Sequence, residues 1–391
     1  MERGFKYRIY PNELQRDQIA RTFGCCRFVY NRALDIKKTV YSETGKSIAT
    51  NDLIKMIPTW KRDPETSWLA QADSMALQQS IRDLDRAYMN FFRRVREGGK
   101  PGFPKFKSRR HARQSYRTNG GKVLDCNHIA LPKLGNVRAK VSRPLQGRFM
   151  SVTVSIDAAG RYFATFLCTD VPSKDAPATN QEVGIDLGVK TLATLSDGTK
   201  IENLRYLKKY ERKLVREQRR LSRRKGARNG EKQSRRYLKQ RKRVAKIHAN
   251  IADARIDALH KITTMLADEN QVLCMENLNV KGMMRNHHLA KAVSDASFGE
   301  FARLLEYKCA ERGRTLVKVD RFYPSSKTCS VCGHRLDALP LSVRSWDCPA
   351  CGAHHDRDVN AARNMLTEGK RILSNTEGTA GHAGTVAAIT A

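Results

Sequence analysis

Two Cys-x-x-Cys pairs near the C-terminal end constrain the fold of this chain more than any other feature. The first pair is Cys329 and Cys332, the second is Cys348 and Cys351, and fifteen residues separate the pairs. A glycine directly follows each pair, which lets the backbone turn so that neighbouring thiolates face one ion. Four thiolates at this spacing predict a zinc ribbon, in which a closed shell of four ligands makes the metal structural. Two disulfides are the alternative, but they would require an oxidising compartment.

The charge of the chain predicts its partner. The 391 residues carry a formal net charge of +34 at pH 7, and 40% of them are hydrophobic, which allows two or three domains with a sizeable core. A chain so positive repels itself unless a polyanion neutralises it, so we expect nucleic acid as the partner. A basic protein of the membrane surface is the alternative, but the sequence has neither an amphipathic anchor nor a lipidation signal. It also lacks an apolar run of about 18 residues and a signal peptide, so we expect no membrane association and an intracellular protein.

The N-terminal half predicts a β-barrel interrupted by helices. Residues 5–10 alternate apolar and basic side chains and stop at Pro11, as a strand would. Short alternating segments between residues 113 and 168 continue this pattern. We expect a barrel that recruits the first strand, with the helices of residues 12–97 inserted between its strands. A Gly/Pro-rich basic link, residues 98–110, marks the boundary of the helical part.

A strongly amphipathic helix is predicted from about residue 74 to 95 in this helical part. One of its faces is an apolar stripe, and the other carries Gln78, Arg82 and Arg86. Ordinary solvation would explain such a polar face, but the charge of the whole chain favours contact with nucleic acid.

The most basic stretch, residues 205–246, has 20 Lys/Arg against three glutamates and supplies half of the net charge. A basic block of this kind can be a disordered arm. Here an apolar stripe continues at steps of three, four and seven on both sides of a break at 226–230, which predicts a helical hairpin with a core-facing edge. We expect the outer face of this hairpin to bind nucleic acid through Arg216, Arg219, Arg220, Arg223, Arg224, Arg235 and Arg236.

The C-terminal half places three acids at corresponding positions of an α/β pattern. Asp186 lies in the first strand of that pattern, Glu276 ends a central strand, and Asp358 begins the last helix. Strand ends and a facing helix N-terminus converge in an open α/β sheet. Three converging carboxylates repel one another unless hard cations neutralise them, and paired magnesium or manganese ions about 4 Å apart suit such an oxygen cage. Ions held in this way activate water for attack on a phosphodiester, so the pattern favours a nuclease.

Each acid alone has a simpler explanation. Asp186 could belong to the phosphate loop of an actin-like ATPase, Glu276 could be a solvated strand end, and Asp358 could cap its helix. Asp356 is the neighbour most easily confused with the third acid. The occurrence of all three in one polycationic chain favours the nuclease.

At these residues the sequence resembles the TnpB family, the OrfB proteins of bacterial and archaeal insertion sequences, which are similar to the ancestors of type V CRISPR effectors. The resemblance rests on GIDLG around Asp186, MENL around Glu276, DRDVNAARN around Asp358 and the cysteine segment YPSSKTCSVCG…WDCPACG. It extends to KYRIYPNELQ, FVYNRAL, FFRRVREGGKPGFPKFK and SDASFGEFARLLEYK. It therefore covers nearly the whole chain.

The resemblance implies an RNase H-like RuvC nuclease domain that carries the zinc ribbon as an insertion. This domain would be joined to an oligonucleotide-binding-type wedge barrel with an inserted helical recognition domain. The implied division is wedge barrel at 1–11 and 111–179, recognition domain at 12–110, nuclease domain at 180–322 with its basic hairpin at 204–265, zinc ribbon at 323–353, nuclease C-terminal helix at 354–370 and a disordered tail at 371–391.

The same resemblance implies an RNA-guided DNA endonuclease of a transposable element. Such a protein is a monomer with its guide RNA in the bacterial or archaeal cytoplasm, at the nucleoid, and it cuts both strands of complementary DNA beside a short transposon-associated motif. Asp186, Glu276 and Asp358 would hold magnesium, the D-x-N-A pattern selects Asp358 over Asp356, and Gln78 would read the short motif. The alternatives are a nuclease-silent RNA-guided repressor, which would lack one of the acids, and a junction-resolving nuclease or transposition accessory protein.

Overall fold

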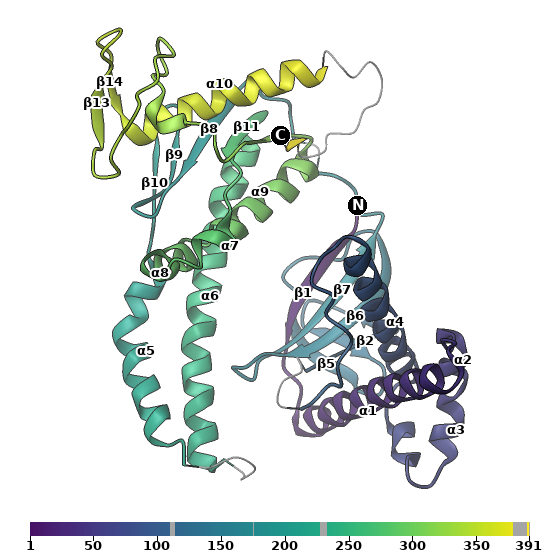
Figure 1. Ribbon diagram of the computed structural model, residues 1–391. Coiled ribbons are helices and arrows are strands. Elements are labelled where there is room, and N and C mark those ends of the chain that lie inside the picture. The colour runs from purple at the N-terminus through teal and green to yellow at the C-terminus, as the bar shows by residue number, and fades with distance from the viewer. Residues whose placement is uncertain (110–113, 175, 227–232, 378–388, 391) are drawn as a thin grey trace. The chain divides into compact units, whose positions relative to one another are not determined.

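The computed structural model describes residues 1–109, 114–174, 176–226, 233–377 and 389–390 (Figure 1). These residues fall into two units, Met1–Pro172 and Ser173–Ala391, and each has an apolar core built on one sheet. Among the described helices, none combines the length and the apolarity needed to cross a bilayer.

The first unit is built on an antiparallel sheet in the order β2-β6-β7-β1-β5-β4-β3. The N-terminal strand lies between β7 and β5, which confirms that the strand-rich region recruits it. Its buried Phe5, Tyr7 and Ile9 alternate with more exposed basic residues, so one face of the strand enters the core. The strands are β1 (Arg3–Ile9), β2 (Ser115–Thr118), β3 (Lys122–Val123), β4 (His128–Leu131), β5 (Gly135–Lys140), β6 (Arg148–Ile156) and β7 (Tyr162–Thr169).

The helices of the first unit follow β1 in the chain, as predicted. Asn12 caps the first helix in a reciprocal capping box with Gln15, and Asp73 caps the fourth by accepting hydrogen bonds from two backbone N–H groups. The first helix is longer than the apolar pattern indicated and ends at Gly45 in the left-handed conformation. The helices are α1 (Glu13–Thr44), α2 (Thr50–Lys55), α3 (Ile57–Arg62) and α4 (Ser74–Arg96), with a 3-10 turn at Ser67–Gln71.

The second unit is built on a mixed sheet in the order β10-β9-β8-β11-β12-β15. The first three strands pair antiparallel, and β8, β11, β12 and β15 pair parallel. Helices α6 and α9 share a core with one face, and α10 packs on the strands along the other. The strands are β8 (Glu182–Leu187), β9 (Thr191–Leu195), β10 (Lys200–Glu202), β11 (Val272–Glu276), β12 (Thr315–Val319) and β15 (Ile389–Thr390), with a separate β13 (Ser345–Asp347) and β14 (His354–Asp356) pair.

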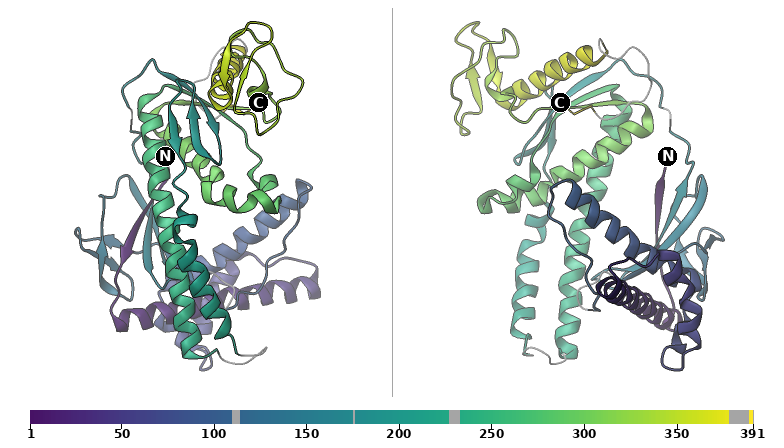
Figure 2. Two further views of the ribbon diagram at one scale, coloured as in Figure 1. Left: turned by 90° about the vertical axis from the view of Figure 1, so that its left-hand side faces the viewer. Right: turned by 45° about the vertical axis from the view of Figure 1, so that its right-hand side comes forward.

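The predicted basic hairpin is folded, and the alternative of a disordered arm is wrong for its described residues. Helices α5 (Tyr206–Arg223) and α6 (Arg235–Glu269) lie side by side (Figure 2) around Leu214, Val244, Ile247 and Ile251. Most of the predicted break at 226–230 lies outside the described residues. The remaining helices are α7 (Val280–Met283), α8 (His287–Ala296), α9 (Phe298–Arg312) and α10 (Arg357–Glu377).

The prediction of a disordered tail from residue 371 is wrong for the first part of that tail. Helix α10 continues to Glu377 instead of ending near residue 370. Lys370 pairs with Glu182 and Arg371 pairs with Glu368 where this extension begins. The Gly/Thr/Ala-rich composition of the tail did not indicate the longer helix. Residues 378–388 and 391 of that tail lie outside the described residues.

Substitution Gly184→Ala should separate α10 from the sheet. An added Cβ would lie 1.9 Å from the carbonyl oxygen of Ala362, and helix backbone cannot yield as a side chain can. We expect a loss of about 3 kcal/mol in the free energy of unfolding, measured by urea denaturation of the full chain.

The matched control is Gly299→Ala in α9, where the nearest atoms to an added Cβ lie 3.9 Å away. It should leave stability unchanged or raise it by up to about 1 kcal/mol. Equal effects of the two substitutions would contradict the close approach of α10.

Candidate functional site

Strand alternation places two of the predicted acids on the face of the sheet that α10 covers. Gly184 and Cys274 both face α10, since a Cβ on Gly184 would meet the Ala362 carbonyl and a Cβ on Gly369 would meet the Cys274 sulfur. Asp186 and Glu276 lie two residues further along the same strands and therefore on the same face. The last paired residues of the parallel β8 and β11 directly precede them. Glu276 is the last residue of β11 and Asp186 the last but one of β8, so the two acids lie at the same end of neighbouring strands.

Asp358, on α10, faces the same side of the sheet as Asp186 and Glu276. It lies in the first turn of α10, one turn before Ala362, whose backbone contacts β8. Residues four apart share a helix face, so Asp358 lies on the face that packs on the sheet. All three acids are half-buried. The structure therefore brings together the three acids that the sequence singled out.

Asp356 is the helix cap, and Asp358 is not. One carboxylate oxygen of Asp356 accepts hydrogen bonds from the backbone N–H groups of Asp358 (3.0 Å) and Val359 (3.1 Å), and the other accepts one from Lys200 Nζ at 2.7 Å. Burial alone would raise the pKa of Asp356, but the bonds from Lys200 and the backbone hold it below its usual value. The alternative that Asp358 merely caps α10 is therefore wrong. Its carboxylate lies 3.5 Å from the Arg344 guanidinium.

The electrostatics of the site are those of crowded carboxylates. Burial, followed by the negative charges of Asp358 and Glu276, raises the pKa of Asp186 to about 7, although Arg357 and Arg344 oppose the shift. Burial also raises the pKa of Glu276. Cations bound among these groups would relieve both effects, because a positive charge stabilises the ionised form.

The three carboxylates are spread more widely than ligands of one ion. Among the described residues, only the four cysteines form a group of three or more possible ligands whose ligand atoms all lie within 4.8 Å of one another. Two ions about 4 Å apart require a wider set of oxygens than one ion does. The spread of the acids is thus compatible with a pair of ions, and the donor set, which is all oxygen, suits magnesium or manganese.

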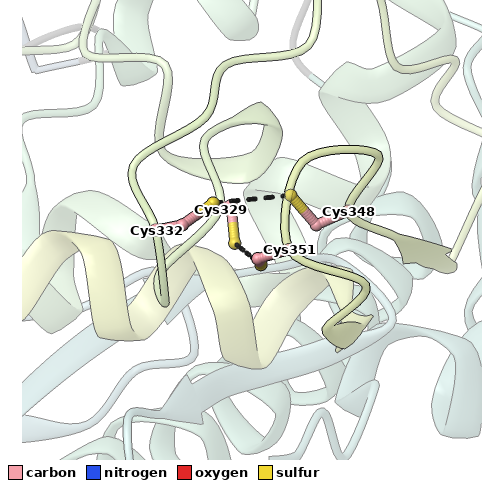
Figure 3. A group of neighbouring side chains, drawn as sticks. All are labelled: Cys329, Cys332, Cys348 and Cys351. Carbon is pink, nitrogen blue, oxygen red and sulfur yellow. Dashed lines mark hydrogen bonds between the residues drawn. The ribbon is translucent and has the colours of Figure 1, made fainter.

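The four cysteines form a compact cluster (Figure 3). The sulfur–sulfur distances are 3.7 Å between Cys329 and Cys351 and 3.6 Å between Cys332 and Cys348. A tetrahedron of sulfurs about 2.3 Å from a central ion has edges of roughly 3.8 Å, so one zinc ion fits. All four cysteines are free in this structure, in agreement with the metal site and not with the disulfide alternative. The glycines after the pairs have φ values of +79° and +70°, as the predicted turns require.

Side chains that the sequence analysis did not single out join this cluster to α10. Asn360 is 1% exposed and donates to the carbonyl of Thr328 at 2.7 Å, while its side-chain oxygen accepts from the N–H of Ser330 at 2.9 Å. Asn364, one turn later, donates to the same Thr328 carbonyl. The spacing of two asparagines four apart in a helix was the available signal, since it places both on one face.

The predicted nucleic-acid contacts lie on exposed basic faces of two separate units. In the first unit Gln78 is half-buried on α4, and Arg82 and Arg86 are exposed. The seven predicted arginines of the hairpin are all exposed in the second unit. Four of them line an open depression along α5, together with Glu211, Arg212 and Val215: these are Arg216, Arg219, Arg220 and Arg223. Arg224 donates to Gln240 at 3.0 Å and thus also braces the hairpin.

Family models match three parts of the chain. Residues 298–365 match the model described as "Cas12f1-like, TNB domain", and residues 166–287 match OrfB_IS605, described as "Probable transposase". Residues 1–46 match a model described as "Helix-turn-helix domain". In this structure those 46 residues are occupied mainly by the strand β1 and the single helix α1.

Two curated relatives match nearly the whole chain. A protein of Streptomyces pristinaespiralis named "Putative RNA-guided DNA endonuclease" is 41% identical over 94% of this chain and 90% of its own. "Putative RNA-guided DNA endonuclease InsQ" of Escherichia coli K12 is 34% identical over 95% of this chain and 93% of its own. The solved structure "Structure of the mini-RNA-guided endonuclease CRISPR-Cas_phi3" superposes with a TM-score of 0.56 at 9% identity over 94% of this chain and 92% of that one, a similarity of fold.

In magnesium-free buffer, Asp186→Asn should stabilise the chain in a pH-dependent way. Folded Asp186 keeps its proton up to about pH 7, whereas unfolded aspartate loses it near pH 3.9, so ionisation destabilises the fold as pH rises through this window. The variant should match the wild type below about pH 4 and exceed it by about 2–4 kcal/mol above pH 7. Urea denaturation from pH 4 to 8 measures this difference. A constant difference at all pH values would contradict the crowding of the three acids.

Proposed function

This chain belongs to the TnpB (OrfB) family, and we propose that it is an RNA-guided endonuclease that cuts double-stranded DNA. The observation that carries the proposal is the meeting of Asp186, Glu276 and Asp358 on one face of an α/β sheet, in a chain of net charge +34. The names of the two curated relatives support the guide and the substrate. The guide RNA is encoded by the transposable element, and the cut lies beside a short motif in the DNA.

The second unit is the RuvC-like nuclease domain of this enzyme. Asp186, Glu276 and Asp358 would hold two magnesium ions, or manganese in their place. When bound, such ions lower the pKa of a water molecule and neutralise charge that develops on the phosphodiester oxygens. The chain's own part is to fix the three carboxylates. Asp186 and Glu276 are fixed by neighbouring strands, and Asp358 by the cap that Asp356 and Lys200 provide.

A structural zinc ion in the cysteine cluster also helps to fix the position of Asp358. The cluster stabilises the loop at Thr328 and Ser330, and this loop binds Asn360 of α10. His355 Nε2 lies 3.0 Å from the Cys329 sulfur and is positioned to orient that ligand. A zinc ion with four protein ligands has no open position for substrate, so its role is to position α10.

Base pairing by the guide supplies sequence specificity, and the protein supplies backbone contacts. We assign those contacts to the exposed arginines of the α5–α6 hairpin and to Arg82 and Arg86 of α4. Gln78 on the same helix reads the short motif. The first unit, in this proposal, is the wedge barrel with the helical recognition domain inserted after β1.

Guided cutting should depend on Asp358 and tolerate a change at Asp356. The chain is expressed with its native downstream locus, the RNA that copurifies is sequenced, and magnesium-dependent cutting of DNA matching the 3′ end of that RNA is measured. Asp358→Asn should lower the rate at least about a thousandfold, because it removes a metal ligand. The matched Asp356→Asn variant should keep most of the rate, because asparagine also caps helices well.

Three outcomes would overturn parts of this proposal. Undiminished cutting by the Asp358→Asn variant would exclude that acid from the metal site. A defined RNA bound by the wild type without cutting would favour the guided repressor. Metal-dependent cutting of branched DNA without a specific RNA would favour the junction resolvase.

The cysteine cluster should hold one zinc ion per chain. Metal analysis of purified protein should find it, and Cys348→Ser should lose it and melt at a lower temperature, because structural zinc contributes directly to folding. The control is Cys126→Ser, since Cys126 is an exposed cysteine outside the cluster and its loss should leave the zinc content unchanged. Equal zinc contents in the two variants would place the metal elsewhere.

A further inference from the structure

An exposed cluster of aromatic rings, the aromatic patch, lies in the first unit outside the site described above. It consists of Tyr88, Phe91 and Phe92 at the end of α4 and Phe103 and Phe106 in the segment that follows. Phe91 packs on Phe92 and on Phe103, with ring centroids 5.1 and 5.3 Å apart. Phe92, Phe103 and Phe106 are 62%, 43% and 51% exposed. Contiguous exposed apolar surface of this kind marks an interaction site more often than single exposed residues do.

Contacts with α1 hold the backbone of the aromatic patch in place. Asn31 of α1 holds the backbone of Lys107 through two hydrogen bonds, donating to its carbonyl at 2.9 Å and accepting from its N–H at 2.7 Å. The Lys107 ammonium lies 3.7 Å from the centroid of the Tyr30 ring, and Pro104 is buried. The described part of the segment that sequence composition assigned to a link is therefore attached to α1 at a fixed place, and its phenylalanines stay at the surface.

Positive charge surrounds the patch. The Lys38 ammonium lies 4.7 Å from the centroid of the Phe106 ring and 5.5 Å from that of Phe103. Five further exposed cations lie close to these phenylalanines in the sequence. Within the described residues none of the five forms an ion pair. These are Arg93, Arg94, Arg96, Lys100 and Lys105. Flat apolar rings bordered by unpaired cations match the two parts of an unpaired nucleotide, its base and its phosphate.

We propose that the aromatic patch is a stacking platform for unpaired nucleotides of the guide RNA, an inference that rests on the proposed function. Unpaired bases are required because base faces are hidden within a duplex. The RNA is favoured over target DNA because it is bound before any target arrives, so it can cover an apolar surface that would otherwise stay exposed. A protein partner would leave the surrounding cations without phosphates.

The test uses the full chain with the RNA that copurifies. Ultraviolet crosslinking and peptide mapping should find RNA attached to Phe92, Phe103 or Phe106. The double variant Phe92→Ala/Phe106→Ala should lose these crosslinks and bind the RNA about tenfold or more weakly, with an unchanged dependence of log affinity on log salt, because no cation is removed. Phe92→Tyr/Phe106→Tyr keeps both rings and should restore both readouts.

The control is Leu14→Ala, which removes an 81% exposed side chain from the same unit. It lies 24 residues before Lys38 on α1, about 36 Å along the helix, and should change neither readout. Wild-type affinity and crosslinks in the double alanine variant would overturn the proposal, as would crosslinks at the patch to target DNA alone. Guided cutting is scored separately. Wild-type protein that crosslinks at the patch but does not cut would contradict the endonuclease and leave the platform standing.

Discussion

The second unit depends on the close packing of α10 against its sheet. At Gly184 the strand approaches the helix backbone so closely that a Cβ would lie 1.9 Å from the Ala362 carbonyl, and at Gly369 the helix approaches the Cys274 side chain in the same way. Ala362 and Gly369 are seven residues apart, which is two turns on one helix face. The two contacts therefore fix both the distance of the helix from the sheet and its rotation about its own axis. The first turn of α10 then meets the ends of β8 and β11. That is where Asp358 joins the two strand acids.

This packing imposes an electrostatic penalty that the fold tolerates. A lone aspartate at the end of a strand would keep an ordinary pKa, but burial and two neighbouring acids raise that of Asp186 to about 7. Arg344 and Arg357 reduce the repulsion without removing it, and Lys200 pairs with Asp356 instead. Residues selected for stability alone would not be arranged in this way, because each ionised carboxylate destabilises its neighbours. In a site that binds cations, the same crowding of carboxylates increases the affinity for the cations.

The sequence predicted the parts of this molecule whose signals are local. Cysteine spacing identified the cluster, alternation identified β1 and its burial, and the three acids were found because strand ends and helix starts can be read from short patterns. Signals that depend on distant partners were missed. Residues 98–110 have the composition of a link, yet Asn31, far earlier in the chain, fixes the backbone of this segment at Lys107. The pairing of Lys370 in α10 with Glu182, a residue of β8, likewise joins positions far apart in the chain.

The asparagines of α10 explain why a single zinc site with four protein ligands and no open position would matter to a nuclease. Successive residues of a helix are rotated by about 100°, so Asn360 points roughly 200° away from Asp358. The sheet therefore holds α10 on the side of Asp358, and the loop that includes Cys329 holds it on the other side through Asn360 and Asn364. A helix held from one side alone can tilt about that contact, and its first turn would move the most. Held from both sides, that turn keeps Asp358 at a fixed distance from Asp186. The precision of a metal site would thus depend on a second metal site that does no chemistry.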